Sequence, residues 1–156
     1  MKKREEISDK KEEALNLLNI LNYKDALSFL KRSLIICKEI GDKDDEAINL
    51  SYIGLCHSIL GNFKKAIILL NKYLKISEKI KDYWVEIQTL DSLAEIFSLM
   101  GRYKKSEVFF NMALKLLERV KDPLSEAIIL NRLGKHYYRK NNFEKAFESH
   151  KRVFEI

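Results

Sequence analysis

The chain has 156 residues, of which 46% are hydrophobic, and it carries a formal net charge of +6. It contains no run near the ~20 consecutive apolar residues of a membrane-spanning helix, and its charged start lacks the apolar segment of a secretion signal. These features predict a cytoplasmic protein that does not enter a membrane. Cys37 and Cys56 are too few for a disulfide scaffold and are predicted to be reduced thiols buried on helices.

A sequence motif occurs four times in phase along the chain. The aromatic residues that mark it recur every 40 positions: Tyr23, Phe63, Tyr103 and Phe143. Apolar residues in each copy fall at intervals of three and four, which predicts two helices per copy. The first helix of each copy is predicted to stop at a residue that tolerates left-handed backbone: Asn22, Gly61, Gly101 and Asn141. The copies are predicted to form one domain, 1–156, with units at about 4–40, 44–80, 84–120 and 124–156.

The first copy departs from this pattern. Lys10 and Glu13 occupy positions that Leu50 and Ile53 fill in the second copy, so its first helix has a polar outer face. A terminal repeat needs such a face because it lacks a neighbour on one side. We therefore interpret the first copy as an N-terminal cap, and the alternative is that residues 1–9 form a disordered tail.

The second and third copies show how the two helices of a hairpin pack. In the second copy Leu50 opposes Leu70 across the turn, and Gly54 opposes Ala66. A small pair lets two helix backbones approach closely, while the larger residues fill the space on either side. The connections between copies begin the next helix, and Asp82 is a predicted N-cap, as is Asp122 before Pro123.

The fourth copy ends at Ile156, short of the length of the earlier copies, and no polar closing helix follows it. Phe147, Val153 and Phe154 are apolar where a further helix would lie. The favoured interpretation is that a longer protein continues beyond this point. The alternative is that the open C-terminal end packs on a partner or on a second copy of the chain.

No catalytic or metal-binding constellation is recognisable. His57 holds a position that is aromatic in later copies, which predicts a packed core histidine. His136 and Cys56 share one position two copies apart, too far to bind the same zinc ion. The five glycines are dispersed and form no phosphate-binding loop. The sequence thus predicts a protein that is not an enzyme, with no catalytic residue, metal or cofactor.

The spacing of Leu133, Gly134 and Tyr137, and of Ala66 and Leu70, resembles the Leu-Gly-x2-Tyr and Ala-x3-Phe pattern of the tetratricopeptide repeat family. The 40-residue period is similar to the long-repeat branch in kinesin-light-chain-like and polarity-adaptor-like proteins and to arrays in bacterial signalling proteins. So is the Asp-x3-Glu pattern before the first helix of the second, third and fourth copies: Asp42 and Glu46, Asp82 and Glu86, Asp122 and Glu126. The resemblance covers about residues 10–156. It implies an all-α, right-handed solenoid of four helix-turn-helix hairpins.

The resemblance also implies where a partner binds, because in this family the first helices of successive hairpins line the concave face. Carried over, it predicts these partner-binding residues: Ser51, Leu55, Ser58 and Ile59 in the second copy; Gln88, Asp91, Glu95 and Ser98 in the third; Ile128, Asn131, Lys135, Tyr138 and Arg139 in the fourth. Long-repeat relatives often hold a peptide backbone with asparagines on this face. Only Asn131 fits that row here, and the alternative is an inner face that is merely solvated.

The predicted face is graded in charge. Asp91 and Glu95 are acidic, while Lys135 and Arg139 one copy later are basic and Arg132 lies nearby. This arrangement favours a peptide segment of mixed charge, extended or helical, whose orientation the charges would select. Reversing both carboxylates to arginine is therefore predicted to change partner choice without affecting folding.

Three other functions compete with peptide binding. The net charge and the basic fourth copy suit nucleic acid, but Tyr137 and Phe143 fill core positions and leave Tyr138 alone to stack on a base. The sequence therefore favours a protein partner. The chain is alternatively the peptide-sensing half of a larger signalling protein, or it self-associates through its open C-terminal end.

Overall fold

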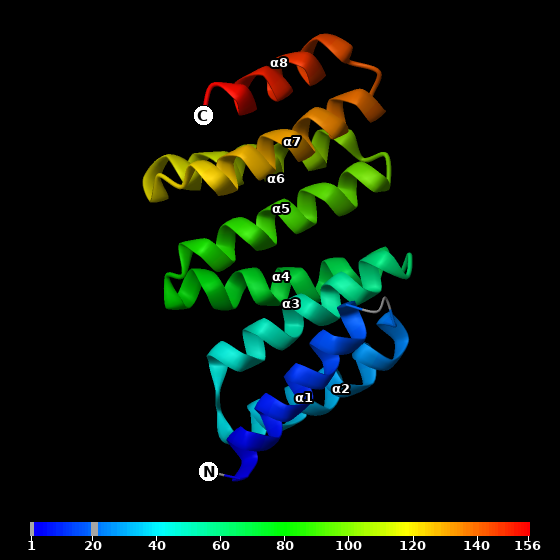
Figure 1. Cartoon of the computed structure of the whole chain (residues 1–156), viewed down its shortest axis with the longest axis vertical. Coiled ribbons are helices and arrows are strands. Elements are labelled where there is room, and N and C mark those ends of the chain that lie inside the picture. Colours follow the sequence, from blue (N-terminus) through cyan, green and yellow to red (C-terminus); the bar gives the residue numbers. More distant parts are fainter. Residues whose placement is uncertain (1, 20–21) are drawn as a thin grey trace. The chain divides into compact units, whose positions relative to one another are not determined.

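The computed structural model describes residues 2–19 and 22–156, which form helices and no β-strand (Figure 1). The helices found in these ranges are α1 (Lys2–Asn19), α2 (Tyr23–Ile40), α3 (Lys43–Ile59), α4 (Phe63–Ile80), α5 (Tyr83–Leu99), α6 (Tyr103–Val120), α7 (Pro123–Arg139) and α8 (Phe143–Phe154). Each predicted copy contributes two of them. The all-α class and the hairpin organisation are confirmed.

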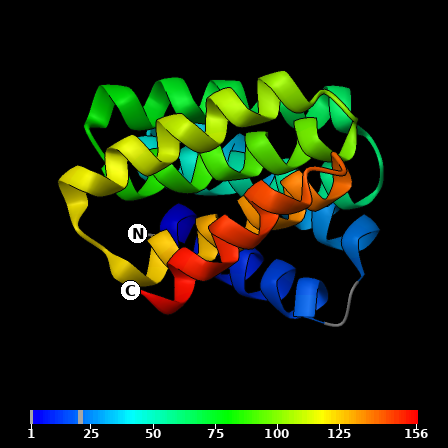
Figure 2. The ribbon, with the colours of Figure 1, turned by 90° about the horizontal axis from the view of Figure 1, so that it is seen from above.

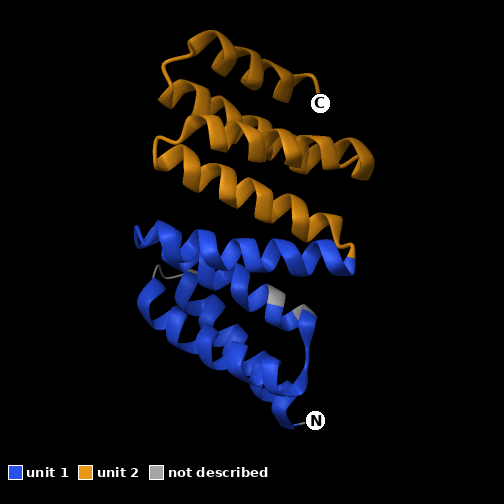
Figure 3. Ribbon diagram, turned by 180° about the vertical axis from the view of Figure 1, so that it is seen from behind, with its two compact units in different colours: residues 1–80 blue, residues 81–156 orange. Residues whose placement is uncertain are grey.

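The helices group into two compact units, residues 1–80 and 81–156 (Figure 3). The first unit contains the hairpins α1–α2 and α3–α4, with α2 packed on α3. The second contains α5–α6 and α7–α8, with α7 packed on both α5 and α6. A single domain over residues 1–156 stays a prediction.

The turns within hairpins follow the predicted backbone chemistry at three of four positions. Gly61 and Gly101 have φ of 74° and 70°, and Asn141 has φ of 59°, all in the left-handed region. The prediction for Asn22 was wrong. It has φ of −88° and is the N-cap of α2, where its side chain accepts a hydrogen bond from the backbone N–H of Asp25. Asn22 thus aligns with Asn62, Arg102 and Asn142 in the later copies, one residue after the positions of Gly61, Gly101 and Asn141.

Helices α5 and α7 begin at the predicted caps. The Asp82 carboxylate accepts a hydrogen bond from the backbone N–H of Val85 at 3.2 Å, and Asp122 accepts from those of Leu124 and Ser125. These bonds satisfy N–H groups that have no partner inside the helix. Both first helices of the second unit therefore start at a fixed residue.

The close approach of paired helices is also confirmed. A methyl group placed on Gly54 would lie 3.1 Å from the side-chain carbons of Leu70, which is 2% exposed. In the next hairpin the Ser106 hydroxyl donates to the Ala94 carbonyl at 2.7 Å. Small residues at the crossing thus bring the second helix against the backbone of the first, as the sequence pattern predicts.

Candidate functional site

The second unit contains most of the predicted partner-binding residues, on the two first helices α5 and α7. We call these residues the first-helix surface: Gln88, Asp91, Glu95, Ser98, Ile128, Asn131, Lys135, Tyr138 and Arg139. Their exposure differs widely. Gln88, Ile128, Asn131, Lys135 and Tyr138 are exposed, and Tyr138 reaches 65%, whereas Glu95 and Arg139 are half-buried. Asp91 and Ser98 are buried, with 7% and 2% of their area exposed.

Two ion pairs join α5 to α7 across this surface. A carboxylate oxygen of Asp91 lies 2.7 Å from the Arg132 guanidinium, and Glu95 lies 2.9 Å from that of Arg139. The predicted gradient of charge is therefore internally paired rather than presented to solvent as separate acidic and basic zones. The sequence pointed to these residues but not to this pairing.

Ion pairing leaves part of each carboxylate without a partner. Asp91 Oδ1 and Glu95 Oε2 are buried and accept no hydrogen bond from any described residue. Burial and, to a smaller extent, the nearby Glu95 charge raise the pKa of Asp91 to about 6, against the opposing effect of Arg132. Asp91 is thus an acid that the fold holds in a partly protonated state near neutral pH.

This environment has a measurable consequence for stability. Between the ordinary pKa of 3.8 and the raised value of about 6, the folded chain binds more protons at Asp91 than the unfolded chain does. Ionisation of Asp91 is therefore expected to lower the free energy of unfolding as pH rises through this window, by at most about 1.4 kcal/mol per pH unit. Urea unfolding of the wild type and Asp91→Asn from pH 4 to 7 measures it.

The difference between the two proteins isolates Asp91 from the other titrating groups. We expect the stability of Asp91→Asn relative to wild type to rise across the window and then to level off above pH 6. Parallel pH profiles would show that Asp91 is not held at a raised pKa.

His136 on α7 is the centre of a buried polar network. It is 0% exposed, and its Nδ1 lies 3.0 Å from Ser106 Oγ and 3.1 Å from Ser98 Oγ. Because the Ser106 hydroxyl donates to the Ala94 carbonyl, its oxygen remains to accept from Nδ1. Burial lowers the pKa of His136, although Glu107 acts in the opposite direction. The sequence indicated a shared core position here but not the network.

Glu107 on α6 connects this network to solvent. Its carboxylate lies 2.7 Å from Lys140 Nζ and 3.5 Å from His136 Nε2. Burial raises the pKa of Glu107, but hydrogen bonds from Lys140 and His136 outweigh burial and bring it below its ordinary value. Together with the Asp91 and Glu95 pairs, these contacts fix α7 against both α5 and α6.

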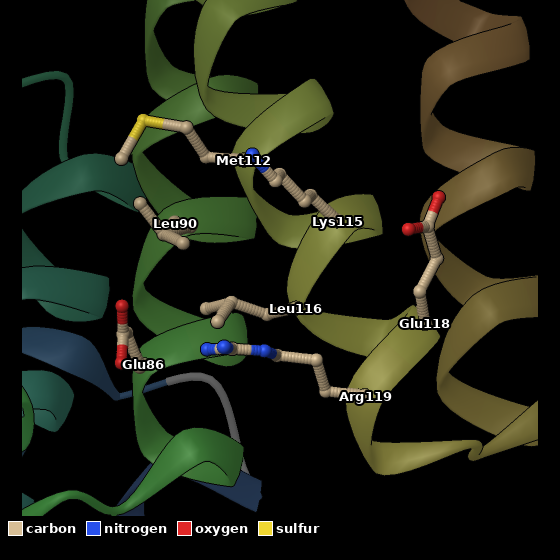
Figure 4. A pocket seen from close by; sticks show the side chains of 7 residues that line it. All are labelled: Glu86, Leu90, Met112, Lys115, Leu116, Glu118 and Arg119. Atoms are coloured by element: carbon tan, nitrogen blue, oxygen red, sulfur yellow. The ribbon is translucent and has the colours of Figure 1, made fainter.

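A cavity of about 630 Å³ lies where α7 meets α8 and contains three residues of the first-helix surface. Its lining is Lys135, Tyr138, Arg139, Phe143, Ala146, Phe147 and His150. The sequence placed Phe147 where a further helix would lie, but it did not combine these α8 residues with Lys135 and Tyr138. A second cavity of about 470 Å³ lies on α5 and α6, and its apolar centre is formed by Leu90, Met112 and Leu116 (Figure 4). It includes none of the predicted residues.

The first unit carries the remaining predicted residues on α3. Leu55 and Ile59 are exposed and lie one helical turn apart, while Ser51 and Ser58 are half-buried. An exposed aliphatic pair on a helix is able to contact an apolar side chain of a partner. None of these four side chains is charged, unlike Asp91 and Glu95 on α5.

The other candidates for chemistry lie in the core. His57 is 7% exposed, as predicted, and burial lowers its pKa, while its Nδ1 has no hydrogen-bond partner among the described residues. Cys37 and Cys56 are buried and free, which confirms that prediction, and burial raises the pKa of Cys56 to about 11. The described residues contain no group of three side chains suited to hold a metal ion. None of their helices is long and apolar enough to span a membrane.

Several solved structures have a similar arrangement of helices, and we describe three whose source organism is known. BtubC (BKLC) from P. vanneervenii aligns with a TM-score of 0.77 and 22% identity over 90% of this chain and 57% of that one. A putative kinesin light chain with nearly identical repeats from Podosopora anserina gives 0.78 and 13%, over 94% and 72%. Aspartyl phosphate phosphatase F from Bacillus subtilis gives 0.75 and 15%, over 96% and 48%. At sequence identities this low, the structural similarity shows a shared fold and nothing more.

The chain spans little more than half the length of the first of these structures. Comparison with curated proteins found no match. The family model for the tetratricopeptide repeat matches residues 14–79 and 86–156, which are the same residues that carry the 40-residue period. Both the sequence pattern and the helical hairpins agree with that match. The chain belongs to the tetratricopeptide repeat family.

Proposed function

We propose that this chain is a non-catalytic adaptor that binds a peptide segment on the first-helix surface of α5 and α7. The observation that carries the proposal is a set of exposed side chains around two neutralised ion pairs. Gln88 and Asn131 offer amides, Lys135 a cation and Tyr138 a large flat ring. Proteins of this family generally act as interaction scaffolds, and a cytoplasmic location stays a prediction.

The ion pairs support this role by holding α7 against α5 in a defined position. A surface that is ordered before binding loses less conformational entropy when a partner docks. Asp91 and Ser98 are therefore positioning residues in this proposal, while the exposed amides contact the partner. Side-chain amides suit an extended peptide because each supplies both a donor and an acceptor to a backbone.

Replacing the two exposed amide side chains by alanine tests the proposal. We expect the variant Gln88→Ala with Asn131→Ala to retain a captured partner at about one tenth of the wild-type level or less, since contact residues carry most of the binding energy. Quantitative affinity capture from cell extract, with both proteins side by side, measures the loss. Val108→Ala is the matched control, because Val108 is exposed on α6 outside the surface.

Equal retention by the double variant and the wild type would contradict the proposal. Nucleic acid is distinguished by two further measurements on the same captured material. A nucleic-acid ligand would be lost after nuclease treatment, and its affinity would fall steeply as salt increases because phosphate contacts release counterions.

A further inference from the structure

Helices α7 and α8 present an apolar and cationic face that adjoins the first-helix surface. We call it the end surface: Lys135, Tyr138, Phe143, Phe147 and His150, which line the cavity of about 630 Å³. Tyr138, Phe143 and Phe147 are 65%, 58% and 67% exposed. Three large aromatic side chains exposed together are uncommon on a monomer and mark a contact site. In Figures 1 and 2, α7 and α8 lie side by side and form this hairpin.

The preceding hairpin shows what occupies the equivalent face. Forty residues before Tyr138, Phe143, Phe147 and His150 stand Ser98, Tyr103, Glu107 and Phe110 on α5 and α6. Each of these four residues contacts α7. The Tyr103 hydroxyl donates to the Arg139 carbonyl at 3.1 Å, and Phe110 packs edge-on against the His136 ring at 5.7 Å. Ser98 and Glu107 contact His136 through hydrogen bonds. A helix therefore covers this face on α5–α6.

The charges of the two faces differ at the positions that select the covering helix. Glu95, which pairs with Arg139 of α7, is replaced by Lys135 on the end surface. Glu107, which pairs with Lys140, is replaced by Phe147. Among the residues that the structure describes, none forms an ion pair with Lys135. A helix like α7 would thus meet a cation in place of the first carboxylate and an aromatic ring in place of the second.

From this difference we propose that the end surface binds an amphipathic helix of a partner protein. That helix carries a carboxylate where α7 has Arg139 and an apolar residue at the position of Lys140, the C-cap of α7. The carboxylate pairs with Lys135, and the apolar side chain packs on Phe147. The hydrophobic face of the helix fills the cavity in the manner of helix-in-groove recognition. This surface is additional to the first-helix surface, with which it shares Lys135 and Tyr138.

The side chains of the end surface are also tightly packed against each other and against the α7 backbone. A methyl group placed on Gly134 of α7 would lie 2.6 Å from His150 Nε2, so the His150 ring rests directly on the α7 backbone. Tyr138 and Phe143 contact each other edge-on with ring centroids 5.5 Å apart. These contacts order the rings before a partner arrives, which reduces the entropic cost of binding.

The chain itself supplies the template for a probe. Two fluorescent peptides are made, both cross-linked on the outer side to hold them helical. The basic peptide copies residues 122–140, and the acidic peptide is the same segment with Arg139→Glu and Lys140→Leu. Fluorescence anisotropy with the full chain is expected to show the acidic peptide binding at least about tenfold more tightly, because one ion pair and one apolar contact replace a like-charge repulsion.

Replacing Lys135 and Phe147, the two residues that discriminate between the peptides, should reverse this preference. In the variant Lys135→Glu with Phe147→Glu, the end surface acquires the charges of the α5–α6 face, and the basic peptide should become the tighter ligand. Both side chains are exposed, so circular dichroism should show unchanged folding. Val108→Glu is the matched control: the site is exposed on α6, its counterpart forty residues later is Glu148, and the substitution should leave the preference of wild type intact.

Three results would overturn the proposal. The first is that neither peptide binds the wild-type chain, and the second is that the double variant keeps the wild-type order of affinities. The third is a dimer in sedimentation that Phe147→Glu abolishes, which would make a second copy of the chain the occupant. The variant Gln88→Ala with Asn131→Ala should bind the acidic peptide like wild type, so failure of the first-helix surface is distinguished from failure of the end surface.

Discussion

Replacing both carboxylates of α5 by arginine, with Asp91→Arg and Glu95→Arg, is expected to lower the free energy of unfolding by about 3–5 kcal/mol. Each carboxylate is the partner of an arginine on α7, and Asp91 is 7% exposed. The double variant would place four guanidinium groups at one helix contact, with the one that replaces the Asp91 carboxylate at a buried site, and would remove both carboxylate partners. Urea unfolding at pH 7 measures the loss.

The control carries the same change in charge at exposed sites of the same unit. Glu118→Arg with Glu148→Arg replaces two exposed carboxylates on α6 and α8, and should alter stability by no more than about 0.5 kcal/mol per site. A double Asp91/Glu95 variant as stable as this control would mean that the two α5–α7 ion pairs do not hold the unit together. The expectation from sequence, that reversal leaves folding intact, is replaced by this one.

The two expectations differ because the sequence pattern of one helix cannot reveal which residues of other helices cover it. Ser51, Asp91 and Asn131 occupy the same position in successive copies, yet they are half-buried, buried and exposed. The ion-pair partner of Asp91 is Arg132, which belongs to the neighbouring hairpin. Periodicity locates a residue on a helix face, whereas its pairing depends on side-chain conformations that the sequence does not encode locally.

The fold was predictable to a greater extent because each element has several agreeing signals. The aromatic position Phe63, the left-handed Gly61 and the close contact at Gly54 all fix the same hairpin, and each is present in the structure. The Asn22 error arose where only one signal was available, since asparagine suits both a left-handed turn and an N-cap. Agreement between independent local preferences thus made the helix assignments reliable.

For His136, the position could be predicted from the sequence but the hydrogen bonds could not. Its position on the core side of α7 followed from the repeat, because the same position holds Cys56 and Ile96 in earlier copies. Its hydrogen bonds to Ser98 and Ser106 did not follow, since those residues lie on two other helices. A histidine where the two preceding copies have Cys56 and Ile96 was the available signal for such a network.

Enlarging the residue at the crossing of α3 and α4 is the second change with a large expected effect. Gly54→Leu should lower the free energy of unfolding by about 3 kcal/mol, at the upper end of overpacking costs. Even the first added carbon would lie 3.1 Å from Leu70, and Leu70 is too buried to swing into solvent. Thermal unfolding followed by circular dichroism measures the shift.

Two further variants separate overpacking from other causes. Gly54→Ala adds the tight contact but removes the entropic cost of a helical glycine, about 1 kcal/mol, so the two effects should nearly cancel. Leu70→Ala opens the space that the larger side chain introduced by Gly54→Leu would require, and the double variant Gly54→Leu with Leu70→Ala should be more stable than the sum of the single losses predicts. Strict additivity of the two changes would place the strain elsewhere, because residues that compete for one volume must couple.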